Sequence, residues 1–459
     1  ASDDYGISSI DLVYYPVDNR KEVSKVKLED SNSAFTRFYY SFPNDKLDLT
    51  EGKTYEYFFR ATDNDRVNGF KSTRSSIFSF KKRTQEEQEE RQLKQQSKSI
   101  DDMEESLQKL KKNKLNIDEL KKLQREKQQL NYSDKKKIKD FIERQEQQQN
   151  MMERFNKSMQ ENLSEFNKQE NDQQKKNLQK RLKSNEENLK ENKELLKKLD
   201  EYNKKLDNED LQKNLEEYDK ENSKQERNLE EILELTKRYY VEEKTRKLAR
   251  ELEKMAKKQK ELADRKEENE SVAQDSLNKD FEKVSKELDS LQKENKQLKE
   301  PYALPDNEEK QKAVKKDQEK AKEDLEKAEN SDAEQQESQS QQNAKKSQKN
   351  AAEKMKNMSQ QMNSMMSMAG RQQAREDAKM LRRVLQNLLV YSKEQENLID
   401  RFKAIDDQSP NFGKYLQRQA SLKENFKHVD DSLFALALRN PMIGQEITEK
   451  ITEVDYNID

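Results

Sequence analysis

The 459-residue chain is too polar to close around one thick globular core, because only 30% of its residues are hydrophobic whereas 41% are charged. Its 92 basic and 94 acidic side chains nearly cancel, so long-range attraction to nucleic acid or anionic lipid is not implied. The absence of cysteine excludes disulfides, thiolate metal sites and thiol nucleophiles, and a single histidine leaves little metal or acid–base chemistry.

Residues 1–82 carry the signals of a small β domain. The segment 49–55 resembles the approach to a tyrosine corner, in which a tyrosine hydroxyl bonds back across a turn of an immunoglobulin fold. The sequence therefore predicts a small all-β Ig-like or fibronectin-like sandwich over this range. Its expected strands contain the alternating apolar residues Ile10, Leu12 and Tyr14, then Phe38, Tyr40 and Phe42, and then Tyr55, Tyr57 and Phe59.

A turn after the last of these runs offers oxygen ligands. Asp63, Asp65 and Asn68 could converge on a calcium ion. The spacing departs from the EF-hand loop, however, because the twelfth position requires a bidentate glutamate and is Arg74 here. Asp and Asn side chains before Gly69 also suit an ordinary hairpin turn, which we favour, so we expect no metal.

Gly52-Lys53-Thr54 has the closing residues of a phosphate-binding loop. The first glycine of that motif would fall at position 47, which is Leu47, and a strand is expected next instead of a helix. The segment is therefore interpreted as a turn, and no cofactor is expected. Nowhere does the sequence place a nucleophile beside a base, which indicates a chain that is not an enzyme.

After residue 82 the apolar period changes from two to 3.6 residues, which predicts helix. Residues 83–206 are expected to form several helical segments, with Asn116 and Ser133 as helix caps. Residues 207–300 are expected to be long coiled-coil helices, because apolar side chains step by four and three residues in turn. The predicted seam contains Leu211, Leu215, Tyr218, Leu229, Ile232, Leu248, Leu252, Leu277, Phe281, Val284, Leu288 and Leu291.

Asn222, Gln225 and Thr236 interrupt this seam with polar groups, which lower stability but restrict the register of pairing. If residues 209–299 form one helix, it would be about 135 Å long at 1.5 Å per residue. Pairing within one chain and pairing between two chains both fit the pattern, so self-association is an open possibility.

Residues 301–350 are expected to be a proline break and a polar flexible linker, because 331–350 lacks an apolar period. A Met-rich helix is expected over 351–376, and a helical bundle that continues beyond the end over 377–459. Methionines at helical spacing could dock an apolar protein partner, although ordinary helix packing is the favoured interpretation. The candidates are Met355, Met358, Met362, Met365 and Met366.

Several segments resemble a bacterial family, the domain of unknown function 4175 family of long envelope proteins in Gram-negative bacteria. They include residues 3–6 (DDYG), 238–242 (RYYVE), 385–396 (LQNLLVYSKEQE) and 431–441 (DSLFALALRNP). The resemblance implies a membrane-anchored parent whose anchor lies outside this chain, with the present segment on the periplasmic side of the inner membrane. Some relatives carry an ATPase label, to which the incomplete loop at Gly52 gives no support.

These observations predict a non-catalytic structural or scaffold protein of the bacterial cell envelope that binds protein partners, possibly itself, through coiled coils. Neither nucleic acid nor a small-molecule substrate is expected. One alternative is a regulatory or coupling part of a membrane-anchored ATPase or enzyme whose catalytic domain is absent. Another is a cytosolic coiled coil associated with the chromosome or the cytoskeleton.

Overall fold

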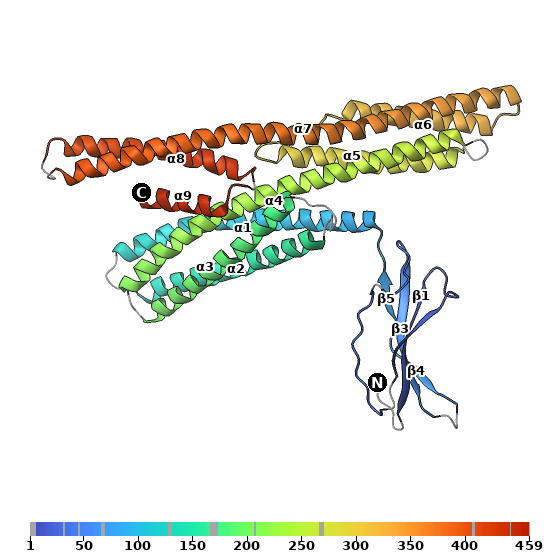
Figure 1. Cartoon of the computed structure of the whole chain (residues 1–459), viewed down its shortest axis with the longest axis horizontal. Helices are drawn as coiled ribbons and strands as arrows, with labels where there is room; N and C mark the ends of the chain where they lie inside the picture. The colour runs from blue at the N-terminus through green and yellow to red at the C-terminus, as the bar shows by residue number, and fades with distance from the viewer. Residues whose placement is uncertain are drawn as a thin grey trace. The chain divides into compact units, whose positions relative to one another are not determined.

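A computed structural model describes residues 6–30, 33–44, 46–65, 69–126, 131–165, 173–205, 208–265, 270–405, 409–440 and 442–458. The chain divides into two units, residues 1–94 and 95–459. All described strands belong to the first unit, and the second consists of helices and their connections (Figure 1).

The first unit contains one antiparallel sheet in the order β2-β1-β3-β4. β5 pairs with the first part of β3, at residues 54–57, and β4 pairs with a later part, at residues 60–62. Both therefore lie on the same edge of β3. The strands are β1 (Ile7–Pro16), β2 (Ser24–Asp30), β3 (Thr54–Asp63), β4 (Ser72–Arg74) and β5 (Phe78–Lys81).

The predicted Ig-like or fibronectin-like sandwich is wrong, because all described strands lie in a single sheet. The run Phe38, Tyr40 and Phe42 forms no strand, although its side chains face the sheet. Phe42 stacks on Tyr57 with 3.9 Å between ring centroids, and Phe38 meets Phe59 edge-on at 5.3 Å. The alternation of apolar and polar residues thus predicts which side chains pack on an apolar face. A second sheet would also require another strand whose backbone hydrogen-bonds to this run.

The local features around β3 follow from turn chemistry. The Tyr55 hydroxyl accepts a hydrogen bond from the Thr50 amide at 2.8 Å, which is the contact that the tyrosine-corner resemblance led us to expect. Gly52 turns the chain with φ of +83°, a conformation that favours glycine, and Thr54 then begins β3. Gly52 therefore precedes a strand and not the N-terminus of a helix.

Nine helices are described: α1 (Gln85–Glu126), α2 (Tyr132–Glu165), α3 (Gln173–Lys205), α4 (Asn208–Asp264), α5 (Ser271–Lys296), α6 (Glu308–Glu329), α7 (Glu334–Lys403), α8 (Phe412–Ala437) and α9 (Gln445–Ile458). A capping box begins α1, since the Glu87 amide donates to the Thr84 hydroxyl oxygen and the Thr84 amide donates to the Glu87 carboxylate. Asn131 and Asp134 bond reciprocally in the same way at the start of α2. Asn116 lies inside α1, so it is not a helix cap as predicted.

The second unit is built from helices that fold back on one another. Residues of α1, α2, α3 and the first part of α4 form one core, in which the Phe141 ring meets the buried Tyr218 ring edge-on. The Tyr218 hydroxyl donates to Gln145 at 3.0 Å, so its polar atom is satisfied inside the bundle. The condition of one helix over 209–299 is not met, because α4 ends at Asp264 and α5 begins at Ser271.

The last part of α4 forms a second bundle with α5, α6 and the first part of α7 (Figure 1). Four buried glutamines, one from each helix, meet there: Gln259, Gln274, Gln318 and Gln348. Gln259 and Gln274 donate to each other at 2.7 and 3.1 Å. Gln318 donates to Gln259 at 3.1 Å and Gln348 to Gln274 at 2.9 Å, which gives a hydrogen-bonded layer across the bundle.

The predicted flexible linker is also wrong over most of its length, because α7 begins at Glu334 and runs without a break to Lys403. Its end forms a third bundle with α8 and α9 around Val384, Val429, Leu433 and Leu436. Residues 377–403 are thus the end of a long helix that also belongs to the preceding bundle, and not the start of a separate domain.

The predicted seam is buried within this one chain. Of its twelve residues only Leu277 is half-buried, and the others are buried. Gln225 accepts from Gln149 at 2.9 Å and from Asn192 at 2.6 Å, so this polar seam residue bonds to two other helices of the same bundle. The seam is therefore already occupied by intramolecular contacts.

Candidate functional site: a polar junction between the helical bundles

A cavity of about 250 Å³ lies where α3, α4 and α7 meet the segments that follow α5 and α8. Its walls are partly apolar, with Leu178, Leu235 and Tyr239, and partly charged. Gln174, Glu242, Tyr302 and Gly370 also line an adjoining hollow of about 540 Å³ that extends past Met366. The junction therefore joins residues that are up to 268 positions apart in the sequence, from Gln174 to Met442.

One side of the junction is organised by Tyr302, which follows α5. The Arg238 guanidinium lies over its ring, 4.4 Å from the centroid, and donates to the Glu300 carbonyl oxygen at 2.9 Å. The Tyr302 hydroxyl donates to the Glu242 carboxylate at 2.5 Å. Burial, together with the negative charge of Glu242, raises the pKa of Tyr302 well above its ordinary value. The phenol therefore stays protonated and acts as a donor.

The opposite side is organised by Asp377 of α7. Its carboxylate pairs with the Arg439 guanidinium at 2.9 Å and accepts from the amides of Asn440 and Gln373, each at 2.9 Å. Arg439 also pairs with Glu300. Burial alone would lower the pKa of Arg439, but the contacts with Glu300 and Asp377 outweigh burial and raise it. These contacts tie the end of α8 to α7.

The charged groups of the junction thus satisfy one another. Arg238 donates to the backbone carbonyl oxygen of Glu300, and Arg439 pairs with the side-chain carboxylate of the same residue. Glu242 and Asp377 each accept hydrogen bonds from two uncharged side chains. A general base or nucleophile needs a group that is poised to react with substrate. The arrangement is instead suited to holding three helical segments in a fixed relation.

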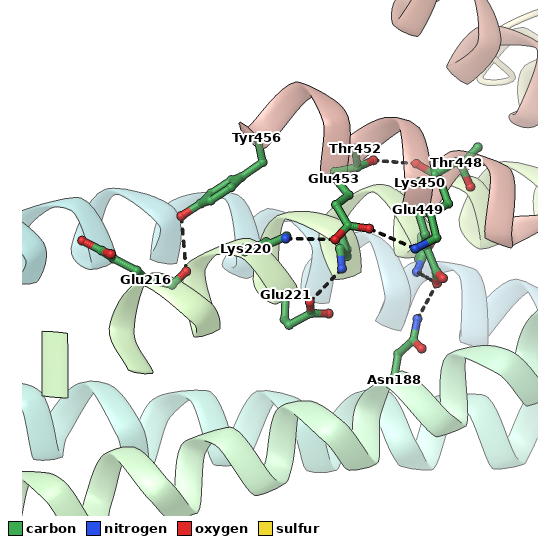
Figure 2. A network of polar contacts seen from close by, with 12 residues as sticks. Asn188, Glu216, Lys220, Glu221, Thr448, Glu449, Lys450, Thr452, Glu453 and Tyr456 are labelled. Carbon is green, nitrogen blue, oxygen red and sulfur yellow. Dashed lines mark hydrogen bonds and ion pairs between the residues drawn. The ribbon is translucent and has the colours of Figure 1, made fainter. Parts of the chain in front are cut away.

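A network of polar contacts attaches the C-terminal helix α9 to α3 and α4 (Figure 2). Glu449 accepts from Asn188 of α3 at 2.8 Å, and Glu453 pairs with Lys220 of α4 at 3.2 Å. The Tyr456 hydroxyl donates to the Glu216 carbonyl oxygen at 3.3 Å. The position of α9 along α4 is therefore specified by hydrogen bonds and charge.

A buried ion pair lies close to the start of α9. Arg181 pairs with Glu231 at 2.9 Å and also donates to the Ile443 carbonyl oxygen. Burial raises the pKa of Glu231 to about 7, which the positive charge of Arg181 only partly opposes. Burial likewise lowers the pKa of Arg181. The two shifts agree that desolvation outweighs the attraction within this pair.

The calcium candidates are only partly covered by the structure, because Asn68 lies outside the described residues. Asp63 ends β3, and its carboxylate accepts from the Lys71 amide at 2.8 Å. This is the turn contact that was weighed against calcium. Among the described residues, no group of three or more His, Asp or Glu side chains is arranged to hold a metal ion.

The methionine candidates fall into two groups. Met355, Met358 and Met362 are buried between helices of the second bundle, where they act as packing residues. Met365 and Met366 remain partly exposed. Sequence periodicity alone could not separate the groups, because α6 covers the first part of this stripe.

Sequence reasoning missed the junction residues Arg238, Glu242, Tyr302, Asp377 and Arg439 as a site. A signal was present, since Arg238 and Glu242 lie in the segment 238–242 and Arg439 lies in the segment 431–441, both noted for their family resemblance. The two segments meet at one cavity. Their proximity depends on tertiary folding and could not be read from local spacing.

Comparison with known proteins gave no match to a family model, to a curated protein or to a solved structure. Within the described parts of the chain, no helix combines the length and hydropathy required to cross a bilayer.

Proposed function

We propose that this chain is a non-catalytic scaffold of the bacterial cell envelope that holds protein partners on a series of connected helical bundles. The observation that carries the proposal is the internal pairing of the junction: Arg238, Glu242, Asp377 and Arg439 are held by neighbours in the same chain. Charged groups used in this way fix geometry, whereas catalysis requires groups that change their partners during a reaction.

The use of apolar side chains supports the same proposal. The seam leucines and the buried methionines pack inside narrow helical bundles. Polar layers such as that of Gln274 restrict the register in which the helices pair. The placement in the envelope, on the periplasmic side of a membrane anchor outside this chain, rests on the resemblance of segments 238–242 and 431–441 to an envelope family.

The proposal is tested by removing ionisable groups without removing hydrogen-bond capacity. Glu242→Gln keeps an oxygen that can accept from Tyr302 but abolishes the carboxylate. In the host that encodes the chain, a strain lacking the gene should be complemented by this variant as well as by the unchanged protein. Growth under envelope stress and retention in the envelope fraction are the measurements.

Loss of complementation by Glu242→Gln, with circular dichroism and abundance unchanged, would contradict the scaffold and favour an enzymatic or regulatory role for the junction. Asp430→Asn serves as a matched control, because Asp430 is also a buried carboxylate paired with an arginine, Arg227, but lies outside the cavity.

A further inference from the structure

A basic hollow of about 520 Å³ lies between α1 and α2 and shares no lining residue with the cavity of the polar junction. Cationic side chains, side-chain amides and one methionine line it, and there is no carboxylate among its described lining residues. The cations are Lys109 and Lys112 of α1 and Arg144 and Arg154 of α2, all exposed. The basic hollow thus concentrates one sign of charge in a chain whose total charge is nearly balanced.

Three of these cations lack an acidic partner. In the part of the chain that the structure describes, no ion pair involves Lys112, Arg144 or Arg154, whereas Lys109 pairs with Glu105, one turn earlier, at 2.6 Å. Other exposed lysines on the helices of this bundle pair with a carboxylate one turn away. The basic hollow therefore differs from the ordinary solvated faces of the same helices.

The groups around the cations are held in place by contacts of the two helices. Gln148 is buried and donates to a backbone carbonyl oxygen of α1 at 3.1 Å, which ties α2 to α1 beneath the hollow. The Arg144 Nε donates to the Asp140 carbonyl oxygen at 3.1 Å, so the terminal N–H groups of its guanidinium remain for an acceptor outside the chain. Gln147 is an exposed amide of the lining and can donate to a peptide carbonyl oxygen.

The excess of positive charge covers only a short stretch. Arg144 and Arg154 are ten residues apart, which is about 15 Å along α2 at 1.5 Å per residue. Beyond this stretch the exposed charges are mixed in sign. They include Lys137 and Asp140 before Arg144, and Asp102, Glu105 and Lys157 near Arg154. A ligand that matches the basic hollow therefore has its negative groups spread over about the same length.

We infer that the basic hollow docks a short acidic segment of a protein partner, with the partner's carboxylates between α1 and α2; this deepens the scaffold proposal and rests on it. Alternate side chains of an extended segment lie on one face about 7 Å apart, so three carboxylates at alternate positions span about 13 Å. This length fits the distance between Arg144 and Arg154. Guanidinium groups can bind such carboxylates through paired hydrogen bonds.

Other anions fit the basic hollow less well. Single-stranded nucleic acid is usually held by aromatic side chains that stack on its bases, and none is found among the described lining residues. An anionic lipid surface extends beyond the basic stretch and would be repelled by Asp102 and Asp140. A compact anion such as diphosphate could pair with neighbouring cations but would leave the more distant ones without a partner.

Fluorescence anisotropy of labelled peptides with the full chain measures the docking directly. A Glu-Ala-Glu-Ala-Glu peptide should bind saturably and more weakly as salt is added, whereas Gln-Ala-Gln-Ala-Gln should not bind. Arg144→Gln together with Arg154→Gln should weaken binding about tenfold with unchanged helicity. Lys197→Gln with Lys198→Gln is the matched control, because it removes the same charge at exposed positions of α3 outside the hollow. Equal loss in the two variants, or no saturable binding, would overturn the inference.

The ion pair of Lys109 gives a test in the opposite direction. Glu105→Gln releases Lys109, so peptide binding should become about threefold stronger. Glu191→Gln changes the total charge equally at an exposed position of α3 and should have little effect. Lys112→Gln should weaken binding more than Lys109→Gln, because Lys109 already has a carboxylate partner. Equal strengthening by Glu105→Gln and Glu191→Gln would mean that only net charge matters and would overturn a defined site.

Competition and complementation separate this inference from its alternatives and from the scaffold proposal. Displacement of the acidic peptide by diphosphate or anionic vesicles at lower concentrations than by unlabelled peptide would overturn a protein segment as the occupant. In the complementation assay, Arg144→Gln with Arg154→Gln should fail although Glu242→Gln succeeds. Full complementation by both would overturn the docking site and leave the scaffold in place. Failure of Glu242→Gln, at unchanged abundance, would overturn the scaffold on which the inference rests.

Discussion

The glutamine layer of the second bundle gives the sharpest test of how this chain specifies its own packing. Gln274 of α5 has one side-chain oxygen, and this atom accepts from the amides of Gln259 and Gln348. All three side chains are fully buried. Substitution Gln274→Leu keeps much of the volume but removes the shared acceptor, so two buried N–H groups lose their partner.

The expected cost follows from that count. A buried donor left without an acceptor costs about 1–3 kcal/mol, so two of them should destabilise the bundle by about 2–6 kcal/mol. Replacing all four glutamines with leucine removes the donors as well as the acceptors. That variant should recover most or all of the stability, because an apolar layer leaves no polar group unsatisfied.

Native-state hydrogen exchange is the suitable assay, since several bundles share helices and global unfolding of the chain is not expected to be two-state. Peptides from α5 and α6 should exchange faster in Gln274→Leu, because the free energy of opening the bundle should fall by about 2–6 kcal/mol. Gln360→Leu, at an exposed position of α7, is the control and should change little. A change below about 1 kcal/mol in Gln274→Leu would refute the reasoning about the layer.

Three further predictions concern the buried groups of the second unit. Because Glu231 has a folded-state pKa of about 7, its contribution to the free energy of unfolding is fully present below its ordinary pKa and is lost as the pH rises through 7, a loss of about 3 kcal/mol. Glu231→Gln should abolish this pH dependence when denaturation is measured at pH 5 and at pH 8. Asp377→Ala leaves the half-buried Arg439 with only Glu300, so the free energy of opening measured by hydrogen exchange in residues 438–458 should fall by about 2 kcal/mol, whereas that of residues 95–126 should be unaffected. Met358→Ala should cost about 2–5 kcal/mol in the second bundle, and no effect there would restore Met358 as a docking residue.

The β region shows what alternation can and cannot predict. The runs around Leu12 and Tyr57 gave real strands, because both their apolar faces and their backbone partners are present. The run around Phe42 has the same alternation but covers the sheet without joining it. Side-chain period fixes the direction in which side chains point, whereas pairing depends on distant backbone groups that a local pattern does not contain.

The helical region was predictable as helix, but its small-residue contacts were not. The stretch predicted to be a flexible linker contains Ala344 and Gln348, both fully buried in α7. A search for leucine at heptad spacing passes over such positions. Small side chains nevertheless allow helices to approach closely, and the glutamine amide finds its partner on another helix. Tertiary packing therefore stabilises a segment whose composition alone suggested disorder.

The junction restricts how the helical bundles can move relative to one another. α4 belongs to the first and second bundles, and α7 belongs to the second and third, so the bundles cannot rotate freely without bending one of these helices (Figure 1). Asp377 and Glu242 then fasten the ends of α8 and α5 at the point where α4 and α7 meet. Loosening the junction by Asp377→Ala should therefore widen the distribution of distances between spin labels placed on α2 and on the exposed face of α7.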